Sequence, residues 1–477
     1  MSDALDMNPN LIGRRAFLQG AGAAGLAPLG LASLLAREDG GAAGLPHFPG
    51  KVRRVVMLTQ SGGPSQLELF DPKPGMVERA GEAIPESVRR GQRLTGMTRG
   101  KPQLVLPSRA RFRPRGESGI ELSDWIPHIG SVADRIALVR SMVTDQINHA
   151  PAMTQFLTGN QLPGRPSLGA WTSYGLGRIS DDLPSFVVLI TRMQRGSDQP
   201  LYDHYWGAGA LPSEHQGVRL RAARSPVLYL DNPGGVGREV RRAQLDGIGA
   251  LNDARRELTG DPEIEARTAQ YELAYRMQAS VPELTDMSDE PDETYALYGP
   301  DSRRAGSYAY HCVLARRMLE RGVRFVQLIH PDWDHHSRLT SWCRMRCRDT
   351  DQPSAALIRD LERRGLLEDT LVVWGGEFGR SPAGQGDWQS LEAGRDHHPC
   401  SFSLFLAGAG VKRGVVHGRT DDYGFHAAED PVHVRDLHAT ILHLLGIDHE
   451  RFAIRQSGLD VRLTGVEPAR VVEELLA

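Results

Sequence analysis

The sequence predicts an α/β protein with a mostly parallel central sheet. Two short apolar runs, at residues 323–329 and 370–375, have the length and composition of buried strands. Each run follows a stretch with helical periodicity, around residues 310–318 and 353–365. Helix and strand in alternation indicate βαβ units, whose crossovers are right-handed.

Further apolar runs supply the rest of the predicted sheet. We expect strands at residues 54–59, 135–140, 185–190, 226–230 and 401–406, besides the two above. Asp261, Pro262 and Glu263 form a typical helix start, and that helix should extend to about residue 279. A last amphipathic helix, carrying Leu437, Ile441 and Leu444, should end at Gly446.

Composition limits the classes of function. The chain has 477 residues, 40% of them hydrophobic, and a formal net charge of −3, which argues against general attraction to nucleic acid or membrane surfaces. The four cysteines form no CxxC motif, so neither a zinc ribbon nor a disulfide framework is indicated. No shift in composition after residue 50 demands a second domain.

The N-terminus has the pattern of a targeting segment. Arg14 and Arg15 precede a run of small apolar residues that is too short to span a bilayer, which needs about 20 residues. Paired arginines followed by Phe17 and Leu18 resemble the twin-arginine export signal of bacteria. We expect a signal peptide at 1–36, a linker at 37–50, one domain at 51–466 and a tail at 467–477. The twin-arginine translocase would then be a partner, and the protein would be periplasmic or extracellular without a stable membrane anchor.

Polar residues follow the two central strands where these end. The first of these strands is followed by five such residues: His330, Asp332, Asp334, His335 and His336. The second is followed by Glu377 and, after the next loop, by Asp396, His397 and His398. The carboxyl ends of parallel strands meet at one edge, where open α/β sheets bind ligands. Carboxylates and imidazoles together suit zinc, manganese or iron better than calcium. A single one of these histidines is more often a hydrogen-bonded loop residue, so the prediction of a metal or anion site depends on their clustering.

Several other chemistries are disfavoured. No Walker loop, GxSxG elbow or GxGxxG motif occurs where a strand meets a helix, which argues against nucleotide binding and a serine hydrolase of that type. Ser65, in the glycine-rich turn after the first strand, is a weak candidate nucleophile.

These stretches together resemble the bacterial domain-of-unknown-function 1501 family. The resemblance covers residues 48–477 and is carried by motifs that include QSGGPSQLELFDPKP, NHAPAMTQFLTG, LVVWGGEFGRSP and GRDHHP. The family is counted with the alkaline phosphatase and sulfatase superfamily, which implies an alkaline phosphatase-like three-layer sandwich with helices on both faces of the sheet.

The superfamily resemblance also implies metal ligands. Asp332 and His336 match an Asp-x-x-x-His pair that holds one metal, and His397 matches a later histidine ligand. Glu377-Phe378 stands where a second Asp-His pair is found, and phenylalanine cannot bind a metal. We therefore expect one divalent ion, held by Asp332, His336, Glu377 and His397. Alternative or outer positions are Asp334, His335, Arg380, Asp396 and His398.

The nucleophile position departs from the sulfatase pattern. His149 stands where sulfatases carry the Cys or Ser that becomes formylglycine, so that chemistry is not available. His149 could act as a general base for water or as a phosphoryl acceptor. The resemblance implies an exported metal-dependent hydrolase of sulfate or phosphate esters. The alternative is a non-catalytic relative that binds an anionic ligand such as a sulfated glycan.

Overall fold

The computed structural model describes residues 44–192, 200–223, 226–228 and 230–477. The predicted signal peptide and half of the predicted linker therefore lie outside the described residues. The described end of the linker packs on the body of the protein, since Leu45 is buried in the core.

Within these residues the main sheet has nine strands. Its order is β12-β4-β11-β8-β1-β7-β5-β6, with β15 added beside β4. The strands are β1 (Arg54–Gln60), β4 (Ile136–Val143), β5 (Phe186–Ile190), β6 (Val218–Leu220), β7 (Phe325–His330), β8 (Thr370–Gly375), β11 (Phe402–Gly408), β12 (Val415–His417) and β15 (Val432–His433). β1 is central and runs parallel to β7 and β8, whereas β11 runs antiparallel to both of its neighbours. The mostly parallel sheet is confirmed.

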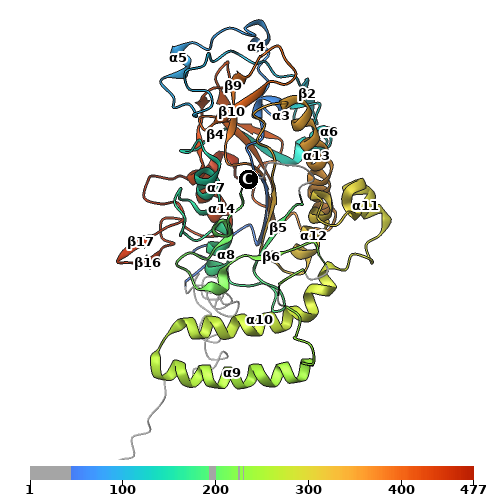
Figure 1. Cartoon of the computed structure of the whole chain (residues 1–477), viewed down its shortest axis with the longest axis vertical. Helices are drawn as coiled ribbons and strands as arrows, with labels where there is room; N and C mark the ends of the chain where they lie inside the picture. Colours follow the sequence, from blue (N-terminus) through green and yellow to red (C-terminus); the bar gives the residue numbers. More distant parts are fainter. Residues whose placement is uncertain (1–43, 193–199, 224–225, 229) are drawn as a thin grey trace, which may run out of the picture.

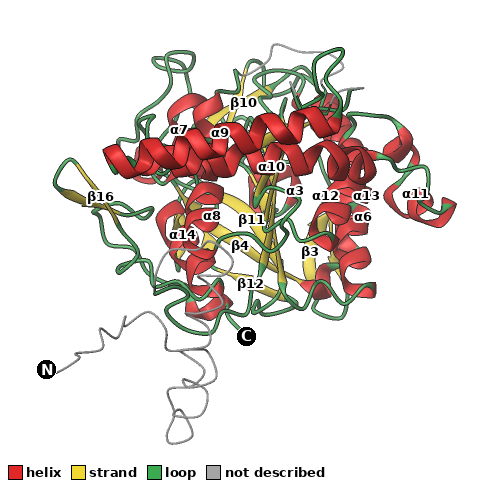
Figure 2. Cartoon of the chain, turned by 90° about the horizontal axis from the view of Figure 1, so that it is seen from below, coloured by secondary structure: helices red, strands yellow, loops and turns green. Residues whose placement is uncertain are grey.

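Helices cover both faces of this sheet (Figures 1 and 2). One side holds α6 (Pro127–Gly130), α12 (Tyr308–Glu320) and α13 (Leu339–Arg363), and the other holds α7 (His149–Thr158), α8 (Leu168–Leu176) and α14 (Val434–Leu444). Successive β1 residues alternate between the two cores: Val56 and Leu58 pack on the first side, Val55 and Met57 on the second. Because successive side chains of a strand point to opposite faces of the sheet, helices pack on both faces and the molecule has three layers.

Two long helices form a separate pair at one end of the molecule (Figure 1). They are α9 (Arg238–Thr259) and α10 (Pro262–Thr285), and α11 (Asp292–Tyr298) follows them. Asp261 caps α10 by accepting a hydrogen bond from the Glu263 N–H, as the sequence predicts. None of the described helices is long and apolar enough to cross a membrane.

Short elements surround the sheet. They are α3 (Gln66–Leu69), α4 (Gly75–Glu78) and α5 (Glu86–Arg89), and the pairs β2 (Phe112–Arg115) with β3 (Ile120–Ser123), β9 (Gly379–Gln385) with β10 (Gly394–His398), β13 (Arg419–Thr420) with β14 (Ala427–Glu429), and β16 (Ile454–Gln456) with β17 (Leu459–Val461).

Some predicted boundaries were wrong. The described residues of 226–230 form no strand, residue 229 lies outside the description, and β6 occupies 218–220 instead. The helix expected at 353–365 begins at Leu339, because Pro353 lies inside α13 rather than starting it. The domain boundaries stay predictions; within the predicted tail at 467–477, Val472 and Leu475 are buried and Leu476 bridges to Val411.

Candidate metal centre

The centre lies at the carboxyl edge of the three middle strands. β7 and β8 flank β1 in parallel register, which pairs Gln60 with His330 and Thr59 with Gly375. The segments that follow these strands therefore start at the same edge of the sheet, as predicted. The β9–β10 hairpin after β8 returns to this edge, with His397 opposite Arg380.

Four side chains converge there: His149, Asp334, His336 and His397. Each offers one ligand atom, and the four atoms lie within 4.8 Å of one another. His149 is the first residue of α7, Asp334 and His336 are in the loop after β7, and His397 is in β10. Asp334 Oδ1 lies 3.2 Å from His149 Nε2, 2.9 Å from His336 Nε2 and 3.2 Å from His397 Nε2.

The other nitrogen of each ring determines which atom faces the centre. The Nδ1 of His149 donates to Glu377 Oε1 at 2.6 Å, and that of His336 donates to Gln385 Oε1 at 2.7 Å. The Nδ1 of His397 donates to the Ile147 carbonyl at 2.7 Å. An acceptor at each Nδ1 assigns the proton there and leaves the Nε2 lone pair for the centre. Such hydrogen bonds are typical of histidines that bind metals.

This arrangement fits a divalent cation. Three Nε2 lone pairs and a carboxylate oxygen that face each other repel unless a positive charge lies between them. His336 Nε2 and His397 Nε2 are 3.0 Å apart. Tetrahedral ligands at zinc bond lengths of about 2.0–2.1 Å are separated by roughly 3.3 Å. Four of the six atom pairs of the cluster lie close to this value, at 2.9–3.2 Å, and all lie within 4.8 Å. His149 Nε2 is buried without a hydrogen bond, although Asp334 is near.

The electrostatics of the cluster also favour a bound cation. Burial lowers the pKa of His149, but contacts with Asp334 and Glu377 outweigh burial and raise its pKa above the ordinary value. Burial lowers the pKa of His397 to about 4. Burial opposes the charge of Asp334, yet Arg380 and the three imidazoles hold its pKa far below the usual range. A charged Asp334 thus draws either a proton on His149 or a metal cation into the centre.

The buried Arg380 holds Asp334 in place through a hydrogen bond and an ion pair. Its Nη2 donates to Asp334 Oδ1 at 2.7 Å, and its Nε donates to the Gly63 carbonyl at 2.9 Å. The guanidinium is fully buried, whereas Asp334 and His336 keep 18% and 22% of their side-chain surface exposed. The centre is therefore closed on the protein side and open to solvent near Asp334 and His336.

Glu377 belongs to the surroundings of the cluster in this structure. It accepts from His149 Nδ1 and from the Gly62 N–H, at 3.0 Å to Oε1. Gly62 has a φ of +112°, and a Cβ there would lie 2.6 Å from the Asp334 nitrogen. Only glycine lets the β1 turn approach both Glu377 and the Asp334 loop so closely. Phe378, the next residue, packs its ring 4.8 Å from His149 and 4.7 Å from His397.

The structure places the remaining predicted residues around the cluster. Asp332 lies outside the group of four, with a φ of 81° and a carboxylate 3.6 Å from Arg346. His335 Nε2 donates to the Asp332 carbonyl at 3.1 Å. Asp396 accepts from the Thr95 and Thr98 hydroxyls, and His398 donates to the Phe425 carbonyl. Ligand roles for Asp332 and Glu377 stay predictions.

The candidate nucleophile Ser65 lies outside the cluster, and its side chain binds a different residue. Its hydroxyl donates to Glu68 and is fully buried. Glu68 in turn receives the Arg395 guanidinium, at 2.7 Å from Nη2 to Oε1. This buried network fixes the turn after β1 against the β9–β10 hairpin.

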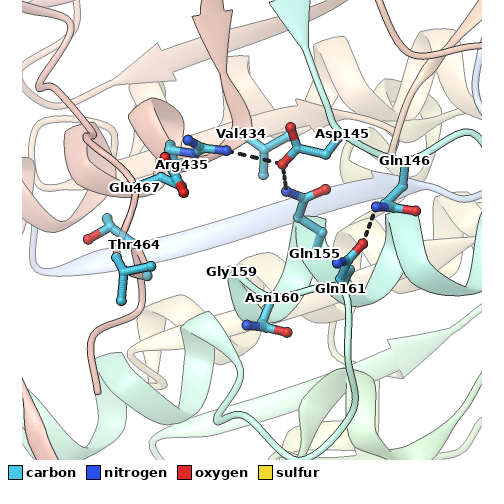
Figure 3. A pocket seen from close by; sticks show the side chains of 12 residues that line it. Asp145, Gln146, Gln155, Gly159, Asn160, Gln161, Val434, Arg435, Thr464 and Glu467 are labelled. Atoms are coloured by element: carbon cyan, nitrogen blue, oxygen red, sulfur yellow. Dashed lines mark hydrogen bonds and ion pairs between the residues drawn. The ribbon is translucent and has the colours of Figure 1, made fainter. Parts of the chain in front are cut away.

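A polar cavity of about 260 Å³ lies beside the segment between β4 and α7, which contributes Asp145 and Gln146 to its lining (Figure 3). Asp145 bridges Gln155 and Arg435 in its wall, at 2.5 Å and 3.1 Å. Gln146, Asn160 and Gln161 add amides to the lining. None of the four clustered side chains lines this cavity.

Sequence reasoning overlooked the groups that orient the imidazoles. Gln385 and the Ile147 carbonyl carry no motif, and a backbone carbonyl has no side-chain signal at all. The sequence offers Asp334 only as an alternative ligand, because Asp332 and His336 have the spacing of the Asp-x-x-x-His pair of the superfamily.

The fold and the centre define the class: a three-layer α/β protein with a three-histidine, one-aspartate cluster at the carboxyl edge of its sheet. The chain belongs to the DUF1501 family, described as proteins of unknown function, whose model matches residues 52–476. No curated protein matches the chain.

Solved structures with related folds include hydrolases. The PsFucS1 sulfatase from Pseudoalteromonas sp. is 13% identical, with a TM-score of 0.32 over 84% of this chain and 68% of that one. The alkaline phosphatase from the Antarctic bacterium TAB5 is 11% identical, with a TM-score of 0.29 over 83% and 98%. The phosphonate monoester hydrolase SpPMH from Silicibacter pomeroyi is 13% identical, with a TM-score of 0.26 over 67% and 68%.

Proposed function

We propose that the protein is a metal-dependent hydrolase of sulfate- or phosphate-type esters. The observation that carries this proposal is the set of three Nε2 atoms around Asp334 Oδ1, each imidazole held by an acceptor at its Nδ1. His149, Asp334, His336 and His397 would hold one divalent ion, with zinc, manganese or iron suiting mixed nitrogen and oxygen ligands. Such an ion polarises an ester oxygen and lowers the pKa of bound water.

The charge of the centre favours an anionic substrate. Asp334 and Glu377 are opposed by one guanidinium, Arg380, so the groups in direct contact with the cluster carry one net negative charge. A divalent ion turns this into one net positive charge, which attracts a sulfate or phosphate ester. The partly exposed side near Asp334 and His336 is where the ester would enter.

We favour attack by water over a covalent intermediate. His149 directs its Nε2 into the cluster and its Nδ1 to Glu377, which leaves neither nitrogen for phosphoryl transfer. Ser65 is buried and bonded to Glu68. Glu377 would keep the proton on His149 Nδ1, and Arg380 would keep Asp334 ionised.

Metal analysis of a ligand variant tests this function. Tag-free protein should contain about one zinc, manganese or iron ion per chain, and His336→Ala should lose it together with hydrolysis of aryl sulfates or aryl phosphates. His128→Ala, at an exposed histidine of α6, is the control and should keep both. Wild-type protein without a bound divalent ion would overturn the proposal. Metal binding without hydrolysis would favour the alternative, a non-catalytic binder of an anionic ligand such as a sulfated glycan.

We also propose export by the twin-arginine route, supported by Arg14 and Arg15 ahead of the apolar run. Replacing both with lysine should leave the protein in the cytoplasm. Fractionation of cells that express each form measures this, and normal export of the variant would exclude the route.

A further inference from the structure

Among the described residues, those that contact helix α9 lie along one of its sides. Leu245 is its only buried residue among those described. Arg242 forms an ion pair with Glu272 of α10 at 2.5 Å, and Asn252 donates to Thr268 of α10 at 3.0 Å. Both figures show α9 as the outermost element at its end of the molecule.

The side turned away from α10 carries an apolar stripe. Val240, Leu251 and Leu258 are 53%, 73% and 88% exposed. At 100° per residue, these three positions fall within about 20° of one line along the helix. The exposed small residues Ala243, Gly247 and Ala254 lie within about 60° of that line, and a Cβ added at Gly247 would meet nothing within 4 Å. The stripe therefore consists of six exposed residues: Val240, Ala243, Gly247, Leu251, Ala254 and Leu258.

The two flanks of the stripe carry opposite charges. Glu239, Asp246, Asp253 and Glu257 all project about 100–140° to one side of the line. Arg241 and Arg255 project about 60–100° to the other side. Asp246 and Asp253 also contact Arg242 and Arg256 within α9, at 2.8 and 3.3 Å.

We propose that the stripe docks onto the same stripe of a second copy of the chain, with the two α9 helices parallel about a two-fold axis. In a parallel pair, opposite flanks meet, so the acidic side of each helix faces Arg241 and Arg255 of the other. An antiparallel pair would bring acidic flank to acidic flank and basic to basic. Charge complementarity therefore favours a second copy of α9 as the partner of the stripe and a parallel orientation of the two helices.

The residues of the stripe suit such a pair. Leu251, Leu258 and Val240 supply the apolar area, and the small residues between them allow the helix axes to approach closely. The contacts of Arg242 and Asn252 with α10 lie on the opposite side, so they remain intact in the dimer. This inference does not depend on the proposed hydrolase activity.

Mass measurement in solution is the first test. The wild-type protein should form a concentration-dependent dimer by light scattering or sedimentation, and Leu251→Asp should shift the equilibrium to monomer by at least about tenfold, since it buries a charge in the stripe. Leu459→Asp, at a leucine of β17 that is 69% exposed, is the matched control and should dimerise normally. A monomeric wild type, or equal dimerisation of Leu251→Asp and the control, would overturn the proposal.

Cysteine cross-linking tests the direction. Among the four native cysteines, only Cys400 is partly exposed, so Cys400→Ser is the background. In a parallel pair each residue meets its own counterpart, so Leu258→Cys and Val240→Cys should each form a disulfide-linked dimer under mild oxidation. In an antiparallel pair centred on α9, either cysteine would lie about 27 Å from its counterpart. A disulfide formed only when the two single-cysteine proteins are mixed would exclude the parallel arrangement.

Discussion

At the scale of single residues, the centre depends on side chains that would not touch the metal themselves. His336 is the most exposed of the clustered imidazoles, and its Nδ1 is held by Gln385 Oε1 at 2.7 Å. Gln385→Ala removes that acceptor and lets the ring turn, so metal affinity should fall about 10–100-fold. Competition with a chromophoric chelator measures the change.

Two further variants make this prediction specific. Gln385→Glu keeps an acceptor at the same place and should retain most of the affinity. Gln389→Ala, at an exposed glutamine in the turn between β9 and β10, should change nothing. Equal affinity of Gln385→Ala and wild type would show that this hydrogen bond does not orient His336.

Asp332 and Asp334 show what residue spacing can and cannot establish. The sequence places both directly after β7, and that part of the prediction holds. Which carboxylate faces the imidazoles depends on how the loop turns: Asp332 adopts a φ of 81° and faces Arg346, while Asp334 reaches Arg380 and the three rings. Residues distant in the sequence make those contacts, so spacing alone could not distinguish the two.

At the scale of elements, the buried strands were predictable and the β9–β10 hairpin was not. Strands such as β1 and β8 are buried on both faces and consist of continuous apolar runs. Residues 379–385 and 394–398 contain glycine, proline and buried arginines, which disfavour strands. The hairpin forms because Arg380 and Arg395 find distant partners, the Gly63 carbonyl and Glu68.

Helix α9 is a second element that our sequence analysis does not predict. Its sequence is mostly polar, and its contacts with α10 include ion pairs, hydrogen bonds and arginines stacked on the Tyr275 ring, while Leu245 is its single buried residue. Such a helix has little apolar burial of its own, and tertiary packing normally supplies most of the stability of a helix. A second α9 on the exposed stripe would supply that packing.

At the scale of the whole molecule, buried histidines should make the protein sensitive to acid. Burial lowers the pKa of His215 and His438 to about 4 and that of His311 to about 3. An unfolded chain binds a proton at each near pH 6.5, so it holds more protons than the folded chain between about pH 6.5 and 4. The free energy of unfolding should therefore fall as pH falls through this window. Asp351, whose pKa burial raises to about 7, acts in the opposite direction.

A histidine outside the metal centre provides the test. In chelator, so that metal release does not contribute, chemical denaturation should show the free energy of unfolding decreasing from about pH 7 to 5. His215→Gln can keep the hydrogen bond to the Ser173 hydroxyl, which lies 3.0 Å from His215 Nδ1, but it cannot bind the proton. The slope should therefore become shallower by up to about 1.4 kcal/mol per pH unit, whereas His128→Gln, at an exposed position, should alter it less. A slope unchanged in His215→Gln would mean that His215 is protonated in the folded protein and that its burial does not contribute to acid sensitivity.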